Sequence, residues 1–263
     1  MEQAAAPLHA MLDLGGRVAV VTGGSRGLGL QVAEALGEFG ATVVIAARKQ
    51  GELESAAAEL RAAGVTADCH VCDLGAPDSI AAFVDWLAGR YDRVDILVNN
   101  AGATWGAATV DHPLAGWRKV IDTNLTGTFL LTQEIGRRWM VPAGRGRIVN
   151  IASIEGLLGH DATMPATIAY NTSKGGLVNF TRALAAEWGG HGITVNALAP
   201  GYFHSRMTAA TLDTHADFIA ARTPRRQLGG QHDLKGAALL FASDAGAHIN
   251  GQVLAVDGGF IAI

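Results

Sequence analysis

Short apolar segments recur along the chain, each six or seven residues long and rich in Val, Ile and Ala. Gly, Asp or Asn commonly bounds them. A nearly continuous apolar run of this length predicts a strand that is covered on both faces, as in a parallel sheet. The segments are residues 17–22, 41–47, 66–72, 93–99, 147–152, 193–199 and 252–257.

Longer stretches with helical spacing of apolar positions lie between these segments, and several of them end in Gly, as helices commonly do. The clearest are residues 28–39, 51–64, 79–89 and 177–190. Strands that alternate with helices imply right-handed crossovers and a doubly wound α/β sheet with helices on both faces. No linker or internal repeat divides the chain, so we expect one domain over residues 13–263 after an N-terminal extension, residues 1–12.

Composition narrows the class of protein. The 263 residues suffice for a substantial core, and the formal net charge of −4 offers no electrostatic attraction to nucleic acid. No apolar run approaches the ~20 residues that span a bilayer, and the N-terminus lacks the pattern of an export signal. We therefore expect a cytoplasmic protein with neither a nucleic-acid nor a membrane partner.

The cysteines form a C-x-x-C sequence, Cys69 and Cys72, inside a predicted strand. Strand residues three apart point to opposite faces, so we expect no redox or metal pair. The nine histidines form no compact set of ligands. No metal site is predicted.

The segment TGGSRGLG, residues 22–29, joins the first predicted strand to the first helix. Gly23, Gly27 and Gly29 lack a Cβ, which lets the backbone approach a phosphate, and the helix N-terminus supplies free N–H groups and positive potential. An ordinary glycine-rich turn is the alternative. The position between the first strand and the first helix favours a dinucleotide site.

The residues after the second strand indicate which cofactor binds. An acidic residue there would bind the ribose 2′-hydroxyl of NAD, but this chain has Arg48 and Lys49, with Arg26 in the glycine loop. Arginine binds phosphate through paired, charge-assisted hydrogen bonds. NADP(H) is therefore favoured, with NAD(H) the less favoured alternative.

Tyr170 and Lys174 lie one helical turn apart in AYNTSKGG and share a face of the predicted helix. A nearby ammonium favours the phenolate and would lower the pKa of the tyrosine, as proton transfer near neutral pH requires. Ser153 follows the end of a predicted strand, at the edge where such sheets bind cofactors. It could hold a substrate oxygen while Tyr170 exchanges a proton.

The glycine pattern, NNAG at 99–102, Asn124 in DTNLTGTF, Ser153, the Tyr170–Lys174 pair and PGYFHS at 200–205 occur in this order. Together they resemble the classical short-chain dehydrogenases/reductases over about residues 13–260. The resemblance implies a hydride-transferring enzyme with a Rossmann-type sheet of seven strands, in the order 3-2-1-4-5-6-7. It also implies a homotetramer paired through helices near 118–141 and 170–189.

The resemblance further implies a catalytic tetrad. Tyr170 would be the general acid and base, and Lys174 would lower its pKa and hold the nicotinamide ribose. Ser153 would orient the carbonyl, and Asn124 would hold a water in a proton relay, although it could instead cap a helix. Asp73 would meet the adenine amine, although it could instead begin a turn.

The glycine loop, the charge argument and the resemblance together assign the cofactor-binding residues. They are Gly23, Ser25, Arg26, Gly27, Leu28, Gly29, Arg48, Lys49, Asp73, Leu74, Asn100, Ala101, Gly102, Tyr170, Lys174, Pro200, Gly201, Phe203 and Ser205.

The segment between Ser153 and Tyr170 is several residues longer than is common in the family, and we expect it to border a mostly apolar substrate pocket. The predicted pocket residues are Trp105, Ser153, Leu157, His160, Met164, Tyr202 and Met207. Residues 203–226 would form a flexible lid over the small-molecule carbonyl or alcohol substrate.

Two functions remain open. The first is an NADP-dependent carbonyl reductase or alcohol dehydrogenase, similar to 3-oxoacyl-(acyl-carrier-protein) reductases, with a gluconate 5-dehydrogenase-like activity on sugar acids as the alternative. The apolar loop after Ser153 argues mildly against a sugar acid. The second is a non-catalytic cofactor-binding scaffold, which has to be considered because fold alone does not fix function. The complete tetrad disfavours it.

Overall fold

The computed structural model describes residues 7–159, 161 and 163–263, and it contains a seven-stranded parallel sheet. The strand order is β3-β2-β1-β4-β5-β6-β7, as predicted. Each predicted apolar segment overlaps one strand. The strands are β1 Val18–Thr22, β2 Thr42–Ala47, β3 Ala67–Val71, β4 Ile96–Asn99, β5 Gly146–Ile151, β6 Ile193–Pro200 and β7 Val253–Val256.

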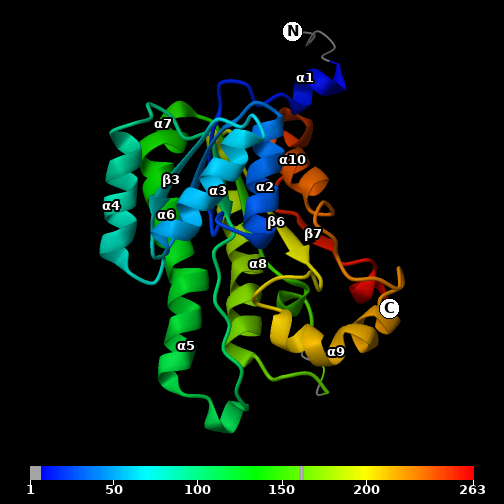
Figure 1. Cartoon of the computed structure of the whole chain (residues 1–263). Coiled ribbons are helices and arrows are strands. Elements are labelled where there is room, and N and C mark those ends of the chain that lie inside the picture. Colours follow the sequence, from blue (N-terminus) through cyan, green and yellow to red (C-terminus); the bar gives the residue numbers. More distant parts are fainter. Residues whose placement is uncertain (1–6, 160, 162) are drawn as a thin grey trace.

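Helices cover both faces of the sheet and enclose two apolar cores (Figure 1). One core lies under α2, α3 and α10, and the other under α4, α6 and α8. β1 and β6 are buried along their whole length because each lies between neighbours in the sheet and between the two helical layers. The helices are α1 Leu8–Leu12, α2 Gly27–Glu38, α3 Gln50–Ala62, α4 Pro77–Ala88, α5 Leu114–Ile121, α6 Gly127–Ile135, α7 Val141–Ala143, α8 Ile168–Trp188, α9 Ala209–Arg222 and α10 Lys235–Ala242.

The two cysteines lie on opposite faces of the sheet, as strand geometry predicted. Cys69 packs against the α2–α3 core, whereas Cys72 belongs to the α4–α6 core, and both thiols are free. Burial raises the pKa of the Cys72 thiol to about 12, so it is protonated at neutral pH. The pair therefore has no redox or metal-binding geometry.

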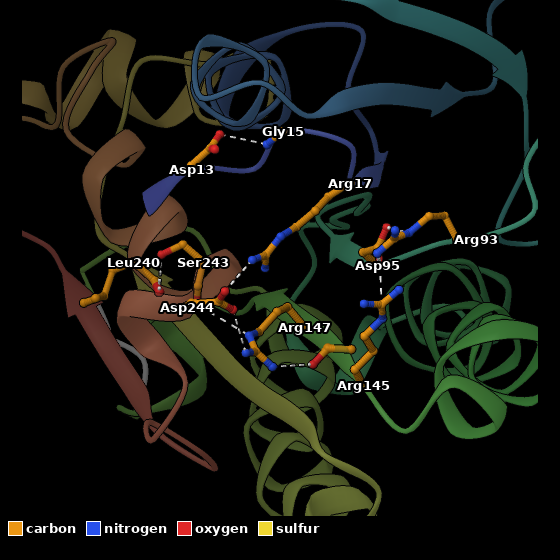
Figure 2. A network of polar contacts seen from close by, with 11 residues as sticks. Asp13, Gly15, Arg17, Arg93, Asp95, Arg145, Arg147, Leu240, Ser243 and Asp244 are labelled. Carbon is orange, nitrogen blue, oxygen red and sulfur yellow. Dashed lines mark hydrogen bonds and ion pairs between the residues drawn. The ribbon is translucent and has the colours of Figure 1, made fainter. Parts of the chain in front are cut away.

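A polar network fixes the amino-terminal edge of the sheet (Figure 2). Asp95, which is 8% exposed, accepts hydrogen bonds from the Val18 backbone N–H at 2.9 Å and from Arg93 Nε at 2.7 Å. Asp244 binds Arg17 at 2.5 Å and Arg147 at 3.1 Å. These contacts join the starts of β1, β4 and β5, and they leave the carboxyl edge of the parallel strands for binding and chemistry.

The connection from β4 to β5 contains a continuous helical column, residues 114–143, which is made of α5, α6, α7 and two π-helical turns. The π-helical turns are Asp122–Thr126 and Gly136–Met140. The sequence predicted helix near 118–141 but not these turns. The first carries Asn124, in agreement with the frequent occurrence of π-turns at functional sites.

The predicted lid, residues 203–226, contains α9, which lies beyond the carboxyl ends of β6 and β7 (Figure 1). Leu212 and Ile219 of this helix pack against Met164, Tyr202 and Phe260. Lid movement stays a prediction. Among the described residues, none of the helices combines the length and the apolar character needed to cross a membrane.

Candidate active site

The glycine loop combines three crowded glycines, Gly23, Gly24 and Gly29, with one open glycine, Gly27. A Cβ on Gly29 would lie 2.3 Å from the Gly23 carbonyl oxygen, and one on Gly23 would lie 2.7 Å from Asn100 Nδ2. Gly27 has a positive φ of 55°, yet a Cβ there would meet nothing within 4 Å. The loop is therefore packed on its inner side and open at Gly27, where α2 begins, as a pyrophosphate cradle requires.

The NNAG segment holds this loop in place. Asn100 Nδ2 donates to the carbonyl oxygens of Thr22 at 2.8 Å and Gly23 at 3.1 Å. The backbone N–H groups of Asn100 and Ala101 both donate to Thr22 Oγ1 at 3.0 Å. Asn100 and Ala101 thus shape the cradle, and their direct contact with a cofactor stays a prediction.

Cations gather where the sequence predicted a 2′-phosphate. Glu52, in the first turn of α3, binds Lys49 at 2.9 Å, Arg206 at 3.5 Å and Arg26. Hydrogen bonding from Lys49 and the charges of these cations lower the pKa of Glu52, so it is ionised at neutral pH. Arg48 is exposed beside them. With three cations around one carboxylate and Arg48 adjacent, the region carries the excess positive charge that a phosphate ester would bind.

The other predicted adenosine-side residues divide into accessible and core positions. The Asp73 carboxylate accepts the Gly75 N–H at 3.0 Å and so caps its own turn, as the alternative reading expected. Leu74 is buried in the α4–α6 core, and Leu28 packs against the α2–α3 core. Ser25 is half-buried in the glycine loop. The leucine side chains therefore contribute to the two cores, and their contact with a cofactor stays a prediction.

Ser153, Tyr170 and Lys174 lie together at the carboxyl end of β5. Ser153 follows β5 and is buried, and its side chain is hydrogen-bonded with Tyr170 from the start of α8. Lys174 is 4% exposed and donates from Nζ to the Ile151 carbonyl oxygen at 2.6 Å. Its Nζ lies 5.6 Å from the centre of the Tyr170 ring. The structure thus brings these three predicted residues together.

The pKa of Tyr170 moves opposite to the predicted direction. Burial raises it to about 12, the hydrogen bond with Ser153 opposes the rise, and the charge of Glu155 adds to it. Burial also lowers the pKa of Lys174 to about 8. The reason is that a low-dielectric site disfavours both the phenolate and the ammonium, while the lysine donates to a backbone carbonyl rather than to the phenol. Tyr170 is therefore a protonated phenol at neutral pH.

Asn124 is 1% exposed, and its side chain is hydrogen-bonded to two other segments of the chain. Its Oδ1 accepts the Ala103 N–H at 2.7 Å, and its Nδ2 donates to the Ala103 carbonyl at 2.9 Å and to Ser173 Oγ at 2.9 Å. Asn124 thereby ties the column to the loop after β4 and to α8. Its predicted role in a proton relay stays a prediction.

Local packing fixes the segment that follows β6. Pro200 ends β6. The next position must be a glycine, Gly201, because a Cβ there would lie 2.8 Å from Asp257 Cβ. Ser205 forms a turn with Thr208, with a 2.9 Å contact between their hydroxyl oxygens. The Phe203 ring, however, is buried against Gly229 and borders a cavity of about 520 Å³ beside β7. Contact of this segment with the nicotinamide stays a prediction.

The predicted pocket residues separate into two groups. Met164 and Tyr202 pack together under α9, and Met207 Cε lies 3.8 Å from where a Cβ of Gly102 would be. Leu157 packs against Ala152 and Val178, and Trp105 covers Gly116 on α5. Contact of these two side chains with a substrate stays a prediction. His160 lies outside the described residues.

Glu155 is a site residue that the sequence analysis missed. It is half-buried two positions after Ser153, and its carboxylate binds Tyr202 and Asn171. The available signal was a lone charge in an otherwise apolar segment, ASIEGLLG. Among the residues that the structure describes, no group of His, Cys, Asp and Glu could hold a metal ion.

Comparisons with known proteins agree with this geometry. The family model described as short chain dehydrogenase matches residues 17–216. Gluconate 5-dehydrogenase of Gluconobacter oxydans is 37% identical over 95% of this chain and 96% of its own length. The 3-oxoacyl-[acyl-carrier-protein] reductase of Escherichia coli is 35% identical over 94% and 98%. The crystal structure of a gluconate 5-dehydrogenase from Burkholderia cenocepacia, in complex with NADP and tartrate, is similar with a TM-score of 0.92 and 35% identity, covering 98% of this chain and 100% of that one.

Proposed function

This chain belongs to the short-chain dehydrogenase family, and from this premise we propose that it is an NADP(H)-dependent oxidoreductase that interconverts a ketone and a secondary alcohol. The observation that carries the proposal is the buried group of Ser153, Tyr170 and Lys174 at the carboxyl edge of β5. The open cradle at Gly27 supports a dinucleotide beside it.

Ser153, Tyr170 and Lys174 would each have a separate role at the reacting carbonyl. When bound, the nicotinamide supplies or accepts the hydride. Ser153 would donate a hydrogen bond to the substrate oxygen, and Tyr170 would give that oxygen its proton during reduction. Because burial keeps Tyr170 protonated at neutral pH, the site is suited to act as an acid in the reductive direction. Lys174 would place its ammonium between the phenol and the cofactor ribose.

The cations around Glu52 support NADP(H) over NAD(H). Relatives whose names specify gluconate and 3-oxoacyl substrates are nearly equally similar to this chain, so both substrate classes are candidates. The apolar cluster of Met164, Leu212, Ile219 and Tyr202 favours the ketone or 3-oxoacyl type.

Tyr170→Phe tests the proposal. We expect NADPH-dependent reduction of a panel of ketones, followed by absorbance, to fall about 1,000-fold or more, because the proton donor is lost. NADPH binding, followed by fluorescence, should change by less than about threefold. Retained turnover in the variant would remove Tyr170 from the chemistry, and a wild type that reduces no carbonyl would overturn the proposal as a whole.

A further inference from the structure

Arg206 connects two distant parts of the carboxyl edge of the sheet. It lies in the lid segment that follows β6, and its Nη1 is 3.5 Å from Oε1 of Glu52, in the first turn of α3, which follows β2. In the strand order, β1, β4 and β5 separate β2 from β6. Because neighbouring strands are about 4.8 Å apart, the lid segment and α3 begin roughly 19 Å apart across the sheet, and this ion pair connects them.

The strands between the two ends of this ion pair include the place where a dinucleotide binds. In doubly wound sheets the dinucleotide occupies the crevice at which the strand order reverses, and in this sheet that crevice lies between β1 and β4. The glycine loop follows β1 and the NNAG segment ends β4, so both border the crevice. The Arg206–Glu52 pair therefore joins one side of the cofactor crevice to the other.

The turn that carries Arg206 is fixed by hydrogen bonds of its neighbours. Thr208 Oγ1 donates to the Phe203 carbonyl oxygen at 2.6 Å, and the hydroxyl oxygens of Ser205 and Thr208 are 2.9 Å apart. The lid helix α9 begins directly after Thr208. A ligand that binds Arg206 therefore also holds the beginning of the lid.

Three cations from separate parts of the chain surround Glu52. Arg26 comes from the glycine loop, Lys49 from the connection between β2 and α3, and Arg206 from the lid segment. Together with the carboxylate they leave an excess of two positive charges, which is close to the charge of an ionised phosphate monoester. Arginine and lysine side chains have at least three N–H donors each, so they can bind a phosphate oxygen and keep their contact with Glu52.

We propose that Arg206 binds the 2′-phosphate of NADP(H) from the lid side, so that the phosphate selects the cofactor and at the same time holds the lid over the substrate site. NAD(H) has a hydroxyl at this position and would not hold Arg206 in this way. The inference rests on the proposed function and adds to it a specificity-determining residue that lies outside the glycine loop and the end of β2.

Calorimetric titration with NADP⁺ and with NAD⁺ tests the direct contact. Arg206→Gln should weaken the binding of NADP⁺ about tenfold, as for the loss of one exposed charge-assisted hydrogen bond, and change the binding of NAD⁺ less than about twofold. Arg206→Lys keeps the charge but loses the paired donors, so its NADP⁺ affinity should lie between those of the wild type and Arg206→Gln. Arg61→Gln is the matched control, because Arg61 is 3.5 Å from Asp68 near the other end of α3. It should leave both affinities unchanged.

Hydrogen exchange of the backbone amides of α9 tests the link to the lid without turnover. In the wild type, saturating NADP⁺ should slow exchange in residues 209–222 at least about threefold more than saturating NAD⁺ does, because the 2′-phosphate holds the start of the lid. Arg206→Gln should remove this difference between the two cofactors, whereas Arg61→Gln should preserve it.

The outcomes separate this inference from the proposed function. Equal losses of NADP⁺ and NAD⁺ affinity in Arg206→Gln would place Arg206 on the pyrophosphate that both cofactors share and overturn the inference, as would unchanged affinities. Equal protection of α9 by both cofactors in the wild type would overturn the link to the lid. Each of these results leaves the proposed function standing. A wild type that shows the expected binding and exchange but reduces no carbonyl compound overturns the proposed function alone.

Discussion

Lys174 is a buried cation whose burial costs stability. Its side chain is 4% exposed, and the pKa falls from 10.5 to about 8 because burial disfavours the ammonium. The Ile151 carbonyl provides a hydrogen bond but not a negative charge. A residue that costs the fold stability in this way is typical of a functional site, where catalysis and stability conflict.

The Lys174→Met variant tests this cost, because the cost of burying the ammonium makes the unfolding free energy of the wild type depend on pH. The folded chain binds this proton less tightly than the unfolded chain, so the penalty is fully present below about pH 8 and disappears as the pH rises toward 10.5. Between about pH 7 and about pH 9.5, we expect the wild type to gain about 2 kcal/mol of unfolding free energy relative to the variant. Urea unfolding at both pH values measures the gain, and a difference that stays constant with pH contradicts the buried-charge argument.

Arg48 is the residue through which cofactor choice can be changed with least effect on packing, since it is exposed. Arg48→Asp replaces a phosphate-binding cation by a repelling anion. We expect kcat/KM for NADPH to fall about 100-fold, while the value for NADH falls less than about threefold. Arg90→Asp makes the same charge change at the end of α4 and should leave both values nearly unaltered. An unchanged NADPH/NADH ratio in Arg48→Asp would refute the 2′-phosphate assignment.

At the scale of elements, the packing of the glycine loop makes Gly29 a position where a side chain does not fit. Gly29→Ala would force a methyl group to within 2.3 Å of the Gly23 carbonyl, so the loop must move. We expect a loss of about 2–3 kcal/mol in unfolding free energy, measured in urea, together with weaker NADPH binding. Gly51→Ala in α3 meets nothing within 4 Å and should be neutral or slightly stabilising. Equal stability of the two variants would show that the loop is not tightly packed.

The sheet could be predicted from the sequence because a parallel strand covered on both faces must be apolar along its length. β1 and β6 are of this kind, and their predicted bounds differ from the observed ones by one residue. The π-turn at Asp122–Thr126 could not be predicted, since it depends on Asn124 reaching Ala103 and Ser173 from other elements. The spacing of apolar residues indicates which face of a helix is buried, but it does not indicate a local change in helical winding.

The residues of the candidate site show the same difference between positions that local sequence determines and positions that depend on distant contacts. Tyr170, Lys174 and Ser153 were predicted because local spacing and the position after a strand fix their places. The places of Leu157 and Trp105 at the substrate pocket stay predictions, because apolar side chains that line a pocket and those that fill gaps between elements have the same sequence signal. Glu155 was missed since its importance arises from Tyr202 and Asn171, which are distant in sequence and meet it only in the folded chain.

At the scale of the whole molecule, the α6–α8 side carries apolar surface. Phe129 of α6 is 44% exposed, and its ring makes an edge contact with Phe180 of α8 at a centroid distance of 6.4 Å. Both rings lie in the helical segments, 118–141 and 170–189, through which the sequence analysis expects chains to pair. An aromatic pair at the surface of packed helices is typical of a subunit interface.

Phe129→Asp tests the predicted homotetramer by placing a charge on that surface. Burying an unpaired carboxylate in an apolar interface costs several kcal/mol, which is enough to dissociate an assembly at micromolar concentration. We expect the wild type to have four chain masses by light scattering and the variant to have two or one, with an unchanged far-ultraviolet circular dichroism spectrum. Phe39→Asp, at the end of α2 and 38% exposed, makes the same change outside the predicted interface and should remain tetrameric. A monomeric wild type would contradict the predicted tetramer. A tetrameric Phe129→Asp variant would show that the subunit interface does not include Phe129 on the α6–α8 side.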